Sequence, residues 1–207
     1  MNTKKIIAVA LAAGMLVSLT ACGGGSSSKK YSKALDDIGY KNVDPEDSED
    51  ALEDDIEDGF YVELTDADDL EDFCEGFEMF DADDANSAVV AERETDEGTF
   101  MVMVVNFKDT DSAEDFFEDA VEVFEDYDED EDDVDCKIVD EDDTFQLAYV
   151  YENEDWEIYM GVFADVQIHG KTVTYIVCMT NDEDSDIMDD IADFYDGIGE
   201  DCPVDLL

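Results

Sequence analysis

The chain has 207 residues, of which 63 are Asp or Glu and only 10 are Lys or Arg, so its formal net charge is −53. Binding to nucleic acid requires clusters of Lys and Arg that neutralise phosphates, and this composition excludes that class of function. Apolar residues make up 44% of the chain and aromatic residues 11%, far more than in a disordered acidic tail. The chain is therefore expected to fold around a hydrophobic core.

The first residues have the features of an export signal. Lys4 and Lys5 precede an uncharged, mostly apolar run at residues 6–20. This run is shorter than the roughly 20 residues that a membrane-spanning helix needs, so it fits a signal peptide better than a transmembrane segment.

The run ends in the sequence Leu19-Thr20-Ala21-Cys22, which resembles the lipobox of bacterial lipoproteins: a branched apolar residue, two small residues and an obligatory cysteine. The resemblance covers this segment alone. It implies cleavage between Ala21 and Cys22 and a diacylglycerol on the Cys22 sulfur, so that acyl chains such as palmitate anchor the protein in the bilayer. The alternative is an ordinary secretory signal with an incidental cysteine. A lipoprotein on the extracytoplasmic face of the cell membrane is the favoured interpretation.

Three regions follow from this interpretation: a signal peptide at 1–21, a lipidated cysteine and tether at 22–30, and a single acidic domain at 31–207. Residues 23–28 are all Gly or Ser, a composition typical of a flexible linker with a reach on the order of 14 Å. Lys29, Lys30 and Lys33 come next, where anionic headgroups would attract them while the acidic domain is repelled. The charge therefore favours one orientation of the domain on the membrane.

The first half of the domain alternates between helix and strand patterns. Helical spacing of apolar residues predicts short helices at 31–39 and 51–56, each closed by a glycine. A strand at 60–64 is followed by Thr65, a capping residue, and by a helix with apolar residues spaced up to Phe80. Strands at 88–93 and 99–107 flank a turn and predict a hairpin. The second of these strands is apolar on both faces, which predicts a central position in a sheet covered on both sides.

The second half is mostly sheet. An amphipathic helix follows Asp111-Ser112 and carries apolar residues from Phe116 to Tyr127. Four predicted strands come next, at 134–139, 145–151, 156–168 and 172–179, and a last helix covers 187–198. Short turns between the strands imply antiparallel pairing. We therefore predict an α+β domain with an antiparallel sheet of about six to seven strands and amphipathic helices mainly on one face.

A weak internal duplication is a further hypothesis. It rests on the similar sequences at residues 109–112 and 182–185, each of which follows a long strand and precedes a helix. Acidic turns before helices also arise by chance in a chain this rich in Asp.

Candidate catalytic residues are few. His169 is the only histidine and precedes Gly170 between two strands, where it is predicted to be the first central residue of a two-residue turn. One histidine excludes zinc sites that need two or three, and no nucleophile-elbow, P-loop or dinucleotide-binding motif is present. No enzymatic activity and no cofactor are therefore expected.

Four cysteines remain after Cys22: Cys74, Cys136, Cys178 and Cys202. An even number in an exported protein is compatible with two disulfides, of three connectivities. Buried free thiols are the alternative, because Cys74 and Cys178 lie in apolar patterns.

Clustered carboxylates raise the question of a calcium site. The densest acidic run contains the candidate ligands Asp126, Asp128, Asp130, Asp132 and Asp133, but an EF-hand starting at Asp126 lacks the glycine and the final glutamate. A loop starting at Asp81 would end correctly at Glu92 but also lacks the glycine. A solvated acidic surface is the favoured interpretation, and weak Ca²⁺ binding is the alternative.

The charge also has an environmental interpretation. Acidic residues occur in every segment of the domain, and repulsion between them weakens as salt shortens the Debye length from about 10 Å at 0.1 M to about 3 Å at 1 M. This pattern is typical of adaptation to salt or minerals, or of an acidic bias across the whole source proteome.

Two functions are compatible with these features. The favoured one is a non-catalytic surface module that binds a protein or cell-wall partner. The alternative is a binding protein for cations or small cationic ligands linked to transport.

Overall fold

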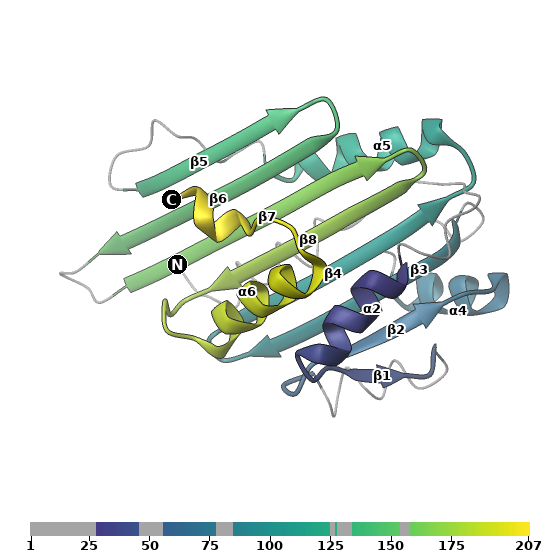
Figure 1. The fold of residues 1–207 in the computed structure, drawn as a ribbon, viewed down its shortest axis with the longest axis horizontal. Helices are drawn as coiled ribbons and strands as arrows, with labels where there is room; N and C mark the ends of the chain where they lie inside the picture. Colours follow the sequence, from purple (N-terminus) through teal and green to yellow (C-terminus); the bar gives the residue numbers. More distant parts are fainter. Residues whose placement is uncertain (1–27, 46–55, 78–84, 125–126, 128–133, 154–157) are drawn as a thin grey trace.

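The computed structural model describes residues 28–45, 56–77, 85–124, 127, 134–153 and 158–207. Eight strands and four α-helices account for most of these residues (Figure 1). The strands are β1 (Lys41–Val43), β2 (Phe60–Leu64), β3 (Ala85–Thr95), β4 (Gly98–Phe107), β5 (Val134–Glu141), β6 (Thr144–Asn153), β7 (Ile158–His169) and β8 (Thr172–Thr180). The helices are α2 (Ser28–Asp37), α4 (Ala67–Phe77), α5 (Thr110–Glu122) and α6 (Asp186–Ile198), and a 3-10 helix, η3 (Pro203–Leu206), follows them.

All eight strands belong to one sheet, in the order β1-β2-β3-β4-β8-β7-β6-β5. Only β1 and β2 pair in parallel; every other neighbouring pair is antiparallel. The hairpins β3–β4 and β7–β8 meet at the centre, where β4 pairs with β8 from Gly98↔Thr180 to Asn106↔Thr172. Every residue of β4 is buried, which confirms the predicted central strand.

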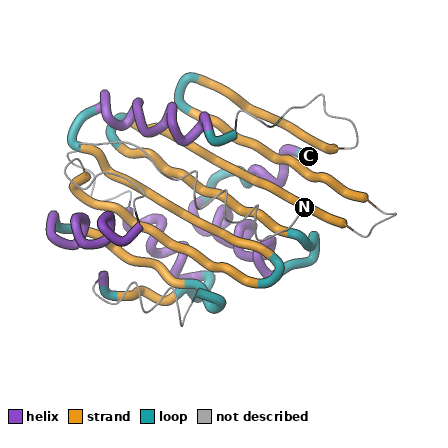
Figure 2. The backbone as a smooth tube through the Cα atoms, turned by 180° about the vertical axis from the view of Figure 1, so that it is seen from behind, coloured by secondary structure: helices purple, strands orange, loops and turns teal. Residues whose placement is uncertain are grey.

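The sheet has a hydrophobic layer on each face. Helices α4 and α5 cover one face, which we call the α4/α5 face, and pack on it through residues that include Leu70, Phe116 and Ala120. Helices α2 and α6 cover the opposite α2/α6 face, through Leu35 and Phe194. Figure 1 shows α2 and α6 in front of the sheet, and Figure 2, from behind, shows the other two helices in front.

Local chemistry defines several ends of these elements. The Asp66 carboxylate accepts hydrogen bonds from the backbone of Asp68 and Asp69, and Asp109 accepts one from the Ser112 backbone, so both residues satisfy free amides at a helix N-terminus. Helix α6 ends at Gly199, whose φ of 70° is the left-handed conformation that glycine adopts readily.

The α+β class and the mostly antiparallel sheet are confirmed, with two corrections. The sheet has eight strands because β1, a three-residue strand too short to show a pattern, adds to its edge. The helices divide between both faces instead of lying mainly on one, since an apolar stripe shows that a helix packs on a sheet but not on which face.

Some boundaries also differ from expectation. Helix α2 begins at Ser28, so residues 28–30, assigned to the tether, are helical. The cap of α4 is Asp66 instead of Thr65. The helix expected at 51–56 falls almost wholly outside the described residues. The two similar acidic turns precede α5 and α6, which lie on opposite faces of the sheet.

Candidate functional site

Most of the site residues expected from the sequence lie outside the described residues. This applies to Ala21 and Cys22 of the lipobox and to the acidic candidates Asp126, Asp128, Asp130, Asp132 and Asp133. The EF-hand alternative that begins at Asp81 is excluded, because residues 85–92 of that loop belong to strand β3. In the described part of the chain, no group of three or more His, Cys, Asp or Glu side chains is placed to hold a metal ion.

His169 is an exposed residue at the end of β7, where it pairs with Thr172 of β8. The central residues of the turn are Gly170 and Lys171, one position later than predicted, and Gly170 supplies the positive φ of 65°. The apolar alternation of β7 ends at Ile168, so the sequence pattern did not show that the strand continues for one more residue.

The cysteines that the structure describes are free thiols. Cys136 and Cys178 are buried, and Cys202 is half-buried. Burial raises the pKa of Cys178, and it raises the pKa of Cys202 to about 11. Both thiols are therefore protonated at neutral pH and are poor nucleophiles. Of the two interpretations for these three residues, the structure agrees with buried hydrophobic thiols.

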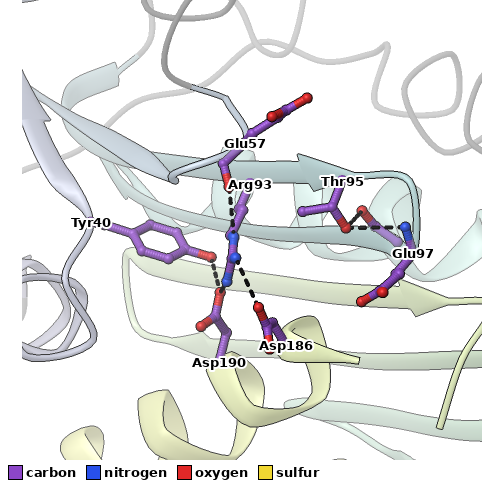
Figure 3. Close-up of polar contacts among 8 residues, drawn as sticks. Tyr40, Glu57, Arg93, Thr95, Glu97, Asp186 and Asp190 are labelled. Carbon is purple, nitrogen blue, oxygen red and sulfur yellow. Dashed lines mark hydrogen bonds and ion pairs between the residues drawn. The ribbon is translucent and has the colours of Figure 1, made fainter. Parts of the chain in front are cut away.

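The first polar cluster surrounds Arg93, the only arginine of the chain, near the end of β3 (Figure 3). Its Nη1 donates to Oδ2 of Asp190 on α6 at 2.8 Å, and its Nε donates to the Glu57 carbonyl at 3.0 Å. Asp186 lies 3.7 Å from Nη2, and the Tyr40 hydroxyl donates to the same Asp190 oxygen at 2.8 Å. The cluster joins β3, α6 and the segment before β2. Because the guanidinium is engaged on three sides by protein oxygens, it functions as a structural link and is not free to bind an anion.

The second cluster centres on Asp165 of β7, a fully buried carboxylate on the α2/α6 face. The Tyr195 hydroxyl of α6 donates to it at 2.8 Å, and Gln167 Nε2 donates to both of its oxygens at 3.1 and 3.0 Å. Gln146 of β6 supplies a further hydrogen bond. Burial raises the pKa of Asp165, although the hydrogen bonds from these three residues act in the opposite direction.

Helix α2 is attached beside this second cluster. The Tyr31 hydroxyl lies 3.0 Å from Thr174 Oγ1 of β8, and the Tyr31 ring stacks on Phe194 of α6. Lys30 forms an ion pair with Glu200, directly after α6. The first helix after the tether is therefore held to the end of α6 by polar and aromatic contacts.

These two clusters are poorly suited to catalysis. Asp165 is shielded from solvent, and its carboxylate accepts hydrogen bonds from the side chains of Tyr195 and Gln167. Asp190 is engaged by Arg93 and Tyr40. The Cys202 thiol is near Asp165, but burial, and secondarily the nearby carboxylates, raise its pKa to about 11, so it is protonated at neutral pH and a poor nucleophile. The geometry of the two clusters indicates that they fix the helices to the sheet.

A polar pocket of about 420 Å³ lies near the start of α4. Its lining combines two carboxylates, one lysine and small polar groups, from Thr65, Asp66, Ala67, Glu71, Ala85, Asn86 and Lys108. The volume falls within the range of small-molecule sites, about 300–1,000 Å³.

No protein-family model matches the chain, and no curated protein matches its sequence. Among solved structures, the extracellular domain of PknH from Mycobacterium tuberculosis is similar to it with a TM-score of 0.33 and 10% sequence identity. The match covers 55% of this chain and 63% of the PknH domain, so the chain spans less than two thirds of that domain's length. The described residues contain no helix with the length and hydrophobicity needed to cross a membrane.

Sequence reasoning did not identify Arg93 or Asp165. The sequence held a signal for both residues. Asp165 interrupts the apolar sequence of β7. Arg93 is the only arginine of a chain with very few basic residues, and it lies in a strand. A charged residue inside an apolar strand requires a partner when it is buried. The partners on helix α6 lie far along the chain, with Asp190 97 residues from Arg93 and Tyr195 30 residues from Asp165, so only the fold identifies them.

Proposed function

We propose that this protein is a lipid-anchored, extracytoplasmic module without catalytic activity, which binds a cationic partner through its acidic helical surfaces. The observation that carries this proposal is the segregation of charge among the helices. Helices α4, α5 and α6 contain many Asp and Glu residues and no Lys or Arg, whereas α2 contains three lysines. Because α4 and α5 lie on one face of the sheet and α6 on the other, acidic helices are present on both faces.

The basic helix is also the one nearest to the proposed lipid anchor. Helix α2 begins only six residues after Cys22, at Ser28. Lys30 and Lys33 are ion-paired with Glu200 and Asp37, while Lys29 is exposed. Anionic headgroups attract such residues, by about 1 kcal/mol for each charge near the surface, and repel the acidic helices. This arrangement favours an orientation with α2 toward the bilayer and acidic surfaces away from it.

The acidic surfaces are available for a partner because few of their charges are neutralised. Every Lys and Arg after the signal segment belongs to the described residues, and several of them are committed to ion pairs: Lys30, Lys33, Lys41 and Arg93. On α5, the exposed side chains include Asp111, Glu114, Asp115, Glu118 and Glu122. A surface of one sign accelerates association with a partner of the opposite sign and makes it dependent on salt.

A photo-crosslinking residue placed at Glu118 of α5, in intact cells, tests the partner. We expect one discrete adduct, formed at low salt and suppressed by high salt. The adduct should disappear when Glu114, Asp115 and Glu122 are replaced by the corresponding amides. A crosslinker at Lys29 of α2, facing the bilayer, is the matched control. An equal adduct at both positions, or an adduct insensitive to the amide replacements, would contradict a partner on the acidic helices.

The anchor is tested by Cys22→Ala. Without the cysteine sulfur, no thioether to diacylglycerol forms, so the variant should remain uncleaved or be released from the membrane. Cell fractionation and labelling with radioactive palmitate measure this. Membrane-bound protein with a mature N-terminus in the variant would refute the lipid anchor and leave the acidic binding surfaces untouched.

The alternative function, binding of a small cationic ligand linked to transport, is supported by the pocket beside Asp66 and Glu71. Its two carboxylates suit an ammonium or guanidinium group. Native mass spectrometry of the purified protein would reveal such a ligand, and Glu71→Gln should reduce its occupancy.

A further inference from the structure

The end of the β3–β4 hairpin on the α4/α5 face holds two buried polar residues, Glu92 and Thr99, and the Thr99 hydroxyl has no hydrogen-bond partner among the described residues. Glu92 of β3 is only 5% exposed and lies between Phe60 of β2 and Met101 of β4. Thr99 of β4 is 6% exposed, and its Oγ1 has no partner. Buried polar groups are nearly always hydrogen-bonded or paired, so an unpartnered hydroxyl beside a buried glutamate requires an explanation.

The register places these groups close together. Glu94 lies directly opposite Thr99, and side chains at such positions have Cβ atoms about 4.5–5.5 Å apart. Glu92 is two residues from Glu94, so both carboxylates and the Thr99 hydroxyl are on the same face of the sheet. Two carboxylates and one hydroxyl are thus gathered within a small region whose other neighbours are apolar.

The described residues provide no positive charge for Glu92. Arg93 follows it in β3 but points to the opposite face, where it binds Asp190. Lys41, at the same level two strands away, is paired with Asp58. Of the segments outside the described residues, 46–55, 78–84, 125–126, 128–133 and 154–157 contain no Lys or Arg, and the two lysines of residues 1–27, Lys4 and Lys5, precede the lipobox in the signal segment. Burial, and secondarily the charge of Glu94, raise the pKa of Glu92 to about 7.

We propose that Glu92, Glu94 and Thr99 form a binding site for a hard divalent cation, held by their carboxylate and hydroxyl oxygens. Ca²⁺ takes carboxylate and other oxygen ligands at 2.3–2.6 Å and completes its shell with water, so it needs few protein groups. The ion would neutralise both glutamates and satisfy the Thr99 hydroxyl. This site is separate from the acidic run near Asp126, and it does not depend on the membrane anchor or on a partner for the acidic helices.

Thermal unfolding of the full chain in mild detergent tests the site. The measurements are made at pH 8 and constant ionic strength, with Ca²⁺ from zero to about 5 mM, a range that covers weak extracellular calcium sites. We expect the Tm of the wild type to rise with Ca²⁺ and to saturate, because an ion that binds the folded state stabilises it. Glu92→Gln keeps the shape of the side chain and should abolish this saturable rise. Glu94→Gln and Thr99→Val should weaken the affinity by roughly tenfold.

Glu97→Gln is the matched control. Glu97 is an exposed acid in the turn of the same hairpin, so this variant loses one charge but no ligand and should respond to Ca²⁺ like the wild type. Equal Ca²⁺ responses of Glu92→Gln and the wild type would overturn the site, since the ion would then bind the diffuse acidic surface. A wild type that does not respond, combined with a Glu92→Gln variant of higher Tm at pH 8, would also overturn it, since the buried glutamate would then destabilise the fold with no ion to offset it.

Discussion

The guanidinium Nη1 of Arg93 lies 2.8 Å from Oδ2 of Asp190, and this contact connects β3 to α6 across 97 residues of sequence. Both side chains are largely buried, with exposures of 17% and 13%. A buried ion pair contributes little net energy compared with apolar replacements, but removal of one partner leaves the other charge buried and unpaired. Arg93 therefore protects the fold against the cost of burying Asp190.

Replacement of Arg93 by methionine should lower the free energy of unfolding by about 3 kcal/mol. Breaking a buried pair typically costs 3–5 kcal/mol, and we expect the lower end of this range because the Tyr40 hydroxyl still donates a hydrogen bond to Asp190. Urea unfolding followed by circular dichroism measures the change. Lys33→Met is the control, because its ion pair with Asp37 is exposed and should be worth less than about 0.5 kcal/mol. Similar losses for both variants would show that Arg93 stabilises only as a surface charge.

The sequence predicted the strands well because the apolar alternation of this chain is strong. Residues 99–107 are apolar on both sides, and the structure places them in β4 at the centre of the sheet. Local patterns cannot specify which strands become neighbours when they are distant in sequence, as β4 and β8 are. The same limit explains the helices: the stripes of α5 and α6 are alike, yet they pack on opposite faces.

The candidate sites were less accessible to sequence reasoning than the fold. Because the chain has 63 acids, the sequence position of one carboxylate does not indicate whether it belongs to a functional site until its burial is known. Among the acids of the described residues, Asp165 and Glu92 are distinguished by their burial in the sheet. Their burial depends on the elements packed above them, which no short sequence pattern records.

Val104→Asp should unfold the domain. Val104 is 3% exposed in the central strand β4, where it belongs to the apolar layer beneath α2 and α6. An unpaired carboxylate there costs several kcal/mol, against a total stability of about 5–15 kcal/mol for a typical domain. Circular dichroism would show loss of the cooperative melting transition. Asp143→Lys, in the exposed turn between β5 and β6, should leave the Tm nearly unchanged. An unchanged Tm for Val104→Asp would contradict the buried central strand.

Asp165 should make the stability depend on pH in a defined direction. Burial raises its pKa in the folded protein, so the folded state binds the proton more tightly than the unfolded state. The corresponding stabilisation is complete below the unfolded pKa, near 3.9, and is lost as the pH rises through the folded value. Asp165→Asn does not titrate, and its amide oxygen still accepts from the Tyr195 hydroxyl. We therefore expect the stability of the wild type relative to Asp165→Asn to decrease between about pH 4 and pH 8.

Urea unfolding of both proteins across this pH range measures the difference. The other carboxylates titrate equally in the two proteins, so their contribution cancels. A difference that stays constant with pH would show that the hydrogen bonds from Tyr195, Gln167 and Gln146 fully offset the burial of the carboxylate. A difference that increases with pH would show that they exceed it.

Salt should stabilise the domain strongly, because most of its carboxylates have no cationic neighbour. The chain has 63 acids and 10 basic residues, so at most a small fraction of the acids can be paired. Helix α5 illustrates the arrangement: Glu114 and Glu118 are four residues apart on its exposed side, a like-charge spacing that destabilises a helix. Folding brings such charges together, and salt screens them as the Debye length falls from about 30 Å at 0.01 M to about 3 Å at 1 M.

The Tm of the protein should therefore rise markedly between about 10 mM and about 1 M sodium chloride. A variant with Glu114→Gln, Glu118→Gln and Glu122→Gln carries less charge on α5, so its Tm should be higher at low salt and should increase less with sodium chloride. Potassium chloride should act like sodium chloride, since screening depends on ionic strength and not on the identity of the ion. A Tm that does not respond to salt would mean that the acids are spaced widely enough for water to screen them, and the hypothesis of salt adaptation would then have no support in the stability of this domain.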